Sequence, residues 1–78
     1  MVLLRLFASA REAAGTGAAD FGGDTVGAVL DEAVNRFGED FAAVLSGCRV
    51  WKNGEPAGRD SLVAAGDEVA VLPPVSGG

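Results

Sequence analysis

The sequence has 78 residues and a mass of 7.8 kDa, which is the size of one domain with a small core. Eleven acidic residues against six basic ones give a net charge of −5, which argues against nucleic acid or an anionic membrane as a partner. The sequence contains no histidine and a single cysteine, Cys48, so we expect no metal site, no internal disulfide and a reducing, cytoplasmic environment.

The first third of the chain predicts two strands separated by a short helical turn. Residues 2–8 alternate along a strand, so that Arg5 and Phe7 share its outer face. Ser9 is followed three residues later by a glutamate, which matches a capping box and predicts that the helical turn begins there. Residues 18–21 are expected to form a weak edge strand.

The middle of the chain contains the strongest helix signal. Apolar residues recur at helical spacing over residues 25–37, which predicts a single apolar stripe that faces the core. We expect Asp24 or Thr25 to cap the start of this helix and Gly38 to close its end. A shorter second helix is predicted to end at Gly47.

The last third predicts a hairpin and a closing strand. Residues 48–52 form the next predicted strand, and the Asn53-Gly54 pair after them predicts a tight turn. Pro56 is expected at a sheet edge or in a turn, and residues 68–72 complete the sheet. This order of elements predicts an α+β fold in which a mixed sheet packs on one main helix.

The six residues after the last strand carry the strongest functional signal. Pro73 and Pro74 cannot continue an interior strand, so we predict a domain over residues 1–72 and a tail over 73–78. The two final glycines have no Cβ, which suits threading into a narrow active site where the α-carboxylate of Gly78 could react. A frayed terminus without function is the competing interpretation.

The chemistry expected of this tail is activation of the Gly78 carboxylate. Coupling to AMP would supply the leaving group that a free carboxylate lacks, and a sulfur nucleophile could then displace AMP and leave a thiocarboxylate. The acid, base and metal would belong to a partner, because the chain has no histidine and no convergent polar cluster is evident in the sequence. Ser76 has no base to activate it, so we expect a small permissive tail residue and not a nucleophile. Cys48 is expected to be a buried small hydrophobe and not a sulfur relay.

An apolar patch is also expected on the outer face of the sheet. Phe7, Trp51 and Leu72 share strand faces with charged residues, and their three strands would be neighbours in such a sheet. Contiguous exposed apolar residues indicate a surface for a partner protein. The alternative is that a loop covers them or that they are scattered surface residues.

These features resemble a known family, the small sulfur-carrier subunit of molybdopterin synthase, which is a ubiquitin-like β-grasp protein. The resemblance rests on four segments near the two ends of the chain: Leu6-Phe7-Ala8, residues 11–15 (REAAG), residues 66–69 (GDEV) and residues 72–78 (LPPVSGG). The chain departs from the pattern at Lys52, where related carriers usually have an apolar residue.

The resemblance implies a specific role for the tail. Gly78, preceded by Gly77, would be adenylated by a ubiquitin-activating-like enzyme that uses ATP and Mg²⁺, while the chain itself would bind no cofactor. The resulting thiocarboxylate would enter the large catalytic subunit of molybdopterin synthase and donate sulfur to cyclic pyranopterin monophosphate. The residues expected to contact partners are Phe7, Trp51, Leu72, Pro73, Pro74 and Val75.

Other functions stay open at this point. Sulfur carriers for the thiamine thiazole or for cysteine are similar β-grasp proteins with Gly-Gly ends. A ubiquitin-like modifier would instead join Gly78 to lysines of other proteins. A stand-alone enzyme is disfavoured, because residues 22–25 fit a helix cap better than a phosphate-binding loop and no catalytic cluster is evident.

Overall fold

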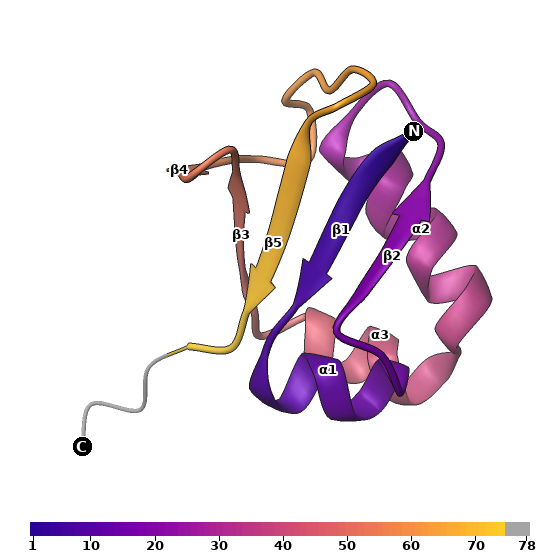
Figure 1. Ribbon diagram of the computed structural model, residues 1–78. Helices are drawn as coiled ribbons and strands as arrows, with labels where there is room; N and C mark the ends of the chain where they lie inside the picture. Colours follow the sequence, from indigo (N-terminus) through magenta and orange to yellow (C-terminus); the bar gives the residue numbers. More distant parts are fainter. Residues whose placement is uncertain (75–78) are drawn as a thin grey trace.

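Five strands form one mixed sheet in the order β2-β1-β5-β3-β4 in the computed structural model, which describes residues 1–74 (Figure 1). The strands are β1 (Val2–Leu6), β2 (Ala18–Phe21), β3 (Arg49–Lys52), β4 (Glu55–Pro56) and β5 (Glu68–Leu72). β1 and β5 run parallel, and the other neighbouring pairs are antiparallel. The predicted mixed sheet is therefore confirmed, including its weak edge strand.

The helices of the described residues are α1 (Ala8–Ala14), α2 (Val26–Phe37) and α3 (Glu39–Leu45). Figure 1 shows α2 crossing one side of the sheet, with α1 and α3 at the end where β1 and β5 finish. The apolar stripe of α2 faces the core, as its spacing predicted: Val26, Val29, Leu30 and Ala33 are buried, and Val34 and Phe37 are partly buried against them. The main helix and the shorter helix after it are both confirmed.

The core lies between α2 and the sheet. Alternate residues of the two central strands point into it and are at most 2% exposed: Val2, Leu4, Leu6, Val69 and Val71. Full burial of such a side chain stabilises the fold by about 1.5–3 kcal/mol relative to exposure. The opposite side chains of the same strands consequently form the other face of the sheet, where the sequence predicted an apolar patch.

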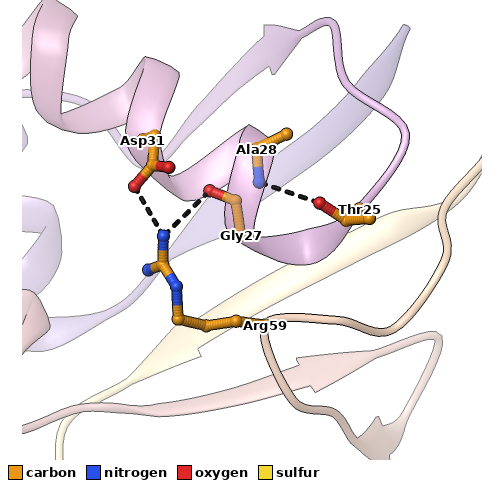
Figure 2. Close-up of polar contacts among 5 residues, drawn as sticks. All are labelled: Thr25, Gly27, Ala28, Asp31 and Arg59. Atoms are coloured by element: carbon orange, nitrogen blue, oxygen red, sulfur yellow. Dashed lines mark hydrogen bonds and ion pairs between the residues drawn. The ribbon is translucent and has the colours of Figure 1, made fainter.

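The start of α2 is held by its cap and by a distant segment of the chain (Figure 2). The Thr25 hydroxyl accepts a hydrogen bond from the Ala28 N–H at 3.1 Å. The N–H of Val26 donates to the Ser61 carbonyl at 2.9 Å, and the N–H of Gly27 donates to the Arg59 carbonyl at 2.8 Å. The backbone donors that a helix start leaves unpaired are thus satisfied.

One local prediction was wrong, namely the capping box at Ser9. The N-cap of α1 is Phe7, no side chain caps it, and Ser9 lies within the helix. The reason is tertiary, because the Phe7 N–H still donates to the Val71 carbonyl at 3.2 Å. The carbonyl of Phe7 then accepts from the Ala10 N–H at 3.1 Å, so the helix starts directly where strand pairing ends.

Candidate partner-binding face and tail root

The predicted patch residues lie on one side of three neighbouring strands, opposite the side that α2 covers. In the pairing of β3 with β5, Arg49 lies opposite Leu72 and Trp51 lies opposite Ala70. Phe7 follows β1, which pairs with β5 on its other side. The structure therefore brings Phe7, Trp51 and Leu72 onto one face, as strand alternation predicted.

A groove of about 420 Å³ lies on this face, next to the point where the chain leaves the sheet. Its lining residues are Arg49, Trp51, Leu72 and Pro73. Trp51 and Leu72 are half-buried, so each still presents part of its apolar surface to a partner. Phe7 is 39% exposed and does not line the groove, so it extends the apolar face beyond it.

Of the arginines on this face of the sheet, Arg5 is paired with an acidic side chain, whereas Arg49 takes part in no ion pair among residues 1–74. Arg5 and Glu68 form a half-exposed ion pair at 3.8 Å, and the Arg5 guanidinium lies 5.9 Å from the centre of the Phe7 ring. Arg49 is exposed and takes part in neither of the ion pairs found among residues 1–74. The groove thus offers an apolar surface beside a cation that no ion pair within residues 1–74 engages, in a chain whose net charge is −5.

The root of the tail begins at this groove. Leu72 is the last residue of β5, Pro73 lines the groove and Pro74 is exposed. Proline has no N–H to donate to a neighbouring strand, so sheet pairing ends here. Val75, Gly77 and Gly78 lie outside the described residues, and their roles, like the division of the chain at residue 72, stay predictions.

Cys48 lies on the helix side of the sheet and not in the groove. It lines a separate cavity of about 360 Å³ together with residues of α2, α3 and the segment that contains Arg59. Its thiol donates to the Val44 carbonyl at 3.2 Å, and burial raises the pKa of the thiol. A reactive cysteine needs the opposite shift, so this environment does not favour a sulfur relay.

Neither a metal-binding cluster nor a membrane-spanning helix is found among residues 1–74. Among residues 1–74, His, Cys, Asp and Glu side chains nowhere gather in threes that could hold a metal ion. The described helices are also too short or too polar for any of them to cross a membrane.

Sequence reasoning missed Arg49 as a wall of the groove. Its outward direction could be deduced from alternation, but its position opposite Leu72 depends on the pairing of two strands that lie far apart in the sequence. The hydrogen bonds that join Asp67 to Asn53 and Ala64, beside Lys52, were missed for the same reason. There the Asp67 carboxylate accepts from the Ala64 N–H at 2.8 Å and from the Asn53 side-chain amide at 3.1 Å, and these hydrogen bonds lower its pKa.

Comparison with known proteins establishes the family. The pattern of the ThiS family matches residues 4–78, which is nearly the whole chain. The chain belongs to the ThiS family, a family of ubiquitin-like sulfur carriers. The resemblance described from the sequence is therefore confirmed at the level of the family.

Several relatives of this ThiS-family chain are known. The small archaeal modifier protein 1 of Haloferax volcanii is 42% identical over 85 residues, covering 95% of this chain and 97% of the relative. The same modifier from Methanosarcina acetivorans has a solution structure with a TM-score of 0.89 at 29% identity, covering 99% of this chain and 95% of that one. A putative molybdopterin converting factor subunit 1 from Pyrococcus furiosus gives a TM-score of 0.83 at 26% identity, covering 95% and 97%. These structures confirm the ubiquitin-like β-grasp fold.

Proposed function

We propose that this chain carries sulfur as a thiocarboxylate on Gly78 and donates it to cyclic pyranopterin monophosphate in molybdopterin synthesis. The observation that carries the proposal is the apolar groove beside the root of the tail, on the sheet face opposite α2. Membership of the ThiS family supports sulfur carriage. The Pyrococcus furiosus structure, which is named as a putative molybdopterin converting factor subunit, favours the pterin as acceptor.

The groove would fix the position of the tail relative to each partner. An apolar side chain of the partner would enter between Trp51 and Leu72, and an acidic side chain would pair with Arg49. Pro73 and Pro74 restrict the backbone directly after this contact, which aims the remainder of the tail into the partner's active site. Docking and delivery are thereby coupled through one continuous stretch of chain.

The chemistry would proceed in two steps on the carbonyl carbon of Gly78. The carboxylate attacks the α-phosphorus of ATP and pyrophosphate leaves, in an activating enzyme that supplies Mg²⁺. Hydrosulfide then attacks the carbonyl carbon, AMP leaves and a proton is released, so that the chain ends in a thiocarboxylate. The chain would bind no cofactor of its own, and we place both steps in the cytoplasm, where ATP is available.

The partners in this scheme are a ubiquitin-activating-like adenylyltransferase and the large catalytic subunit of molybdopterin synthase. This chain would act as the sulfur-donating, non-catalytic subunit. Both partners would use the same groove, so their complexes with the carrier would exclude each other. Competition between the two purified partners for one carrier is a direct consequence that can be measured.

Mass spectrometry of the intact protein tests the proposal. The purified chain is incubated with ATP, Mg²⁺, a sulfur source and an activating enzyme that is competent on another carrier. Conversion to the thiocarboxylate adds about 16 Da, and thiocarboxylate-selective alkylation separates this gain from oxidation of methionine. A matched chain lacking Gly78 must show no gain. Absence of the gain in the full chain would refute sulfur carriage.

The acceptor is tested in a second assay. The charged carrier is offered the pterin, the thiazole precursor and the cysteine precursor, each with its own synthase. The proposal expects transfer to the pterin alone. Transfer to the thiazole or to cysteine, with none to the pterin, would replace the acceptor while leaving sulfur carriage intact.

A second candidate function is conjugation of this chain to other proteins. The observation in its favour is the 42% identity to a protein named as a small archaeal modifier. The activated Gly78 carbonyl would then be attacked by a lysine amine of the target. Target proteins that gain the mass of this chain less one water, only when ATP and Gly78 are present, would support it. Their absence under conditions that fully form the thiocarboxylate would count against it.

A further inference from the structure

The outward side chains of the sheet form rows across it, and one row places a very small residue beside the only tryptophan of the chain. In this row Ala70 of β5 pairs with Arg5 of β1 on one side and with Trp51 of β3 on the other. The side chain of Ala70 is a methyl group, yet the residue is half-buried on the face of the sheet opposite α2. The larger neighbours in its row consequently shield it.

The Trp51 ring lies on the β5 side of its own strand. It lines the groove together with Leu72, the last residue of β5, and with Pro73, which follows it. Leu72 is two residues beyond Ala70, so it is the diagonal neighbour of Trp51 across the strand pair. Diagonal neighbours lie about 7–8 Å apart, which is within reach of an aromatic side chain. The wall that Trp51 contributes to the groove is therefore built over β5.

The sizes of the two direct neighbours of Trp51 explain this direction. Residues directly opposite each other on one face of an antiparallel pair have Cβ atoms about 4.5–5.5 Å apart. On the β4 side that neighbour is Pro56, whose ring occupies the space, whereas on the β5 side the methyl group of Ala70 leaves space free. A longer side chain at Ala70 would fill this space and displace the indole ring from the sheet.

We propose that Ala70 determines which partner side chains the groove admits, because its small size lets the Trp51 ring lie over β5. Ala70 is not among the residues that line the groove, so it is a positioning residue that acts through Trp51. This inference rests on the docking at the groove proposed above, and it names the residue that sets the shape of that site. The occupant is one apolar side chain of the partner, held between Trp51 and Leu72.

The first test uses the free full-length chain. The chain has one tryptophan and no tyrosine, so tryptophan fluorescence reports on the Trp51 ring alone. In Ala70→Leu the ring is expected to move into solvent, which shifts its emission to longer wavelength and strengthens quenching by acrylamide. Ala70→Val should give a smaller change in the same direction and replaces Ala70→Leu if circular dichroism shows that the latter is unfolded. Emission and quenching equal to those of the wild type in a folded variant would overturn the proposal.

Ala18 provides a matched control in the same row. It is exposed on β2 and pairs with Arg5 on the side away from Ala70. Ala18→Leu adds the same atoms to the same face of the sheet, but not next to Trp51, so its emission should equal that of the wild type. An equal shift in Ala18→Leu and Ala70→Leu would show a general effect of added bulk and would overturn the assignment to Ala70.

The second test measures binding to the activating enzyme that converts the wild-type chain to the thiocarboxylate. Ala70→Leu should weaken this binding by roughly 5- to 30-fold, the loss expected for removal of the Trp51 side chain itself. In a Trp51→Ala background, Ala70→Leu should cause no further loss, because no ring remains to be displaced. The same loss in both backgrounds would show that the longer side chain blocks the partner directly, and would overturn the role of Ala70 as a positioning residue.

The combined results separate this inference from the proposed function. If Trp51→Ala weakens binding but Ala70→Leu, with a displaced ring, does not, the position of the ring does not select partners and the inference is refuted while sulfur carriage stands. If Trp51→Ala binds as the wild type does, docking at the groove is refuted and the inference fails with it. If the wild-type chain forms no thiocarboxylate, sulfur carriage is refuted, and the emission of the free variants still decides whether Ala70 positions the ring.

Discussion

Gly27 is the described glycine at which an added Cβ would come closest to another atom. A Cβ added there would lie 3.0 Å from the Arg59 carbonyl oxygen and 3.3 Å from the Arg59 Cβ. That oxygen cannot retreat freely, because it accepts the Gly27 N–H at 2.8 Å and thereby helps to satisfy the start of α2. Gly27→Ala must therefore strain this contact or stretch this hydrogen bond.

The size of the effect follows from two opposing contributions. Overpacking of a tight contact costs about 1–3 kcal/mol, and alanine in a helix recovers at most about 1 kcal/mol relative to glycine. The net expectation for Gly27→Ala is a loss of about 1–2 kcal/mol of unfolding free energy. For a domain of this size the melting temperature should fall by about 4–16 °C, since each kcal/mol shifts it by roughly 4–8 °C.

The assay is thermal unfolding followed by circular dichroism, with Gly22→Ala as the matched control. A Cβ at Gly22 meets nothing within 4 Å, so that variant should differ from the wild type by no more than about 0.5 kcal/mol. Thiocarboxylate formation well below the melting temperature should be unchanged in both, because Gly27 lies on the helix side of the sheet. A melting temperature of Gly27→Ala equal to or above that of the wild type would refute the reasoning.

The remaining predictions concern the groove and the hydrogen-bonded Asp67 carboxylate near Lys52. Trp51→Ala should weaken binding of the activating enzyme by roughly 5- to 30-fold, as truncation of an interface aromatic does. Leu62→Ala removes an apolar side chain that is 72% exposed but lies outside the groove, so it should leave this binding unchanged. Equal effects of the two variants in a binding titration would contradict the proposal that partners bind at the groove. Arg49→Glu should weaken the same binding and alter its salt dependence, while Arg11→Glu, with the same change of charge, should leave both unchanged. The pKa of the Asp67 carboxyl is lowered, first by the hydrogen bond from the Ala64 N–H and then by the hydrogen bond from the Asn53 side-chain amide. The ionised carboxylate therefore stabilises the fold at any pH above the ordinary pKa of 3.8, and this stabilisation is lost as the pH falls through the pKa of the folded state. Urea midpoints of the wild type and Asp67→Asn should therefore differ at pH 7 and converge in acid; a constant difference would show that the charge has no part in it.

Strand and helix order was available from the sequence because it depends on neighbours along the chain. The alternation of residues 2–6 and 68–72 defined the two central strands and the side to which Phe7 and Leu72 point. The helical spacing of apolar residues defined α2, and the hydroxyl of Thr25 caps it as its position suggested. The proline pair and the Gly-Gly end predicted that the tail is the functional segment.

Features that join distant segments were decided by the tertiary structure alone. The register that sets Arg49 opposite Leu72 builds the groove, and one step of slippage would have turned every side chain of β3 to the other face. The start of α1 at Phe7 is set by a hydrogen bond to β5, which overrode the capping pattern at Ser9.

The same distinction explains the surroundings of α2 and Lys52. The Arg59 carbonyl that receives the Gly27 N–H is a backbone group, which every residue carries, so no side-chain pattern announces the contact. The sequence shows that Lys52 is the single lysine and that the chain ends in Gly-Gly, but it does not show how far Lys52 lies from the root of the tail. Local side-chain patterns specify elements, whereas the proposed partner-binding face arises from backbone pairing between elements, and that pairing leaves little trace in the residues that take part in it.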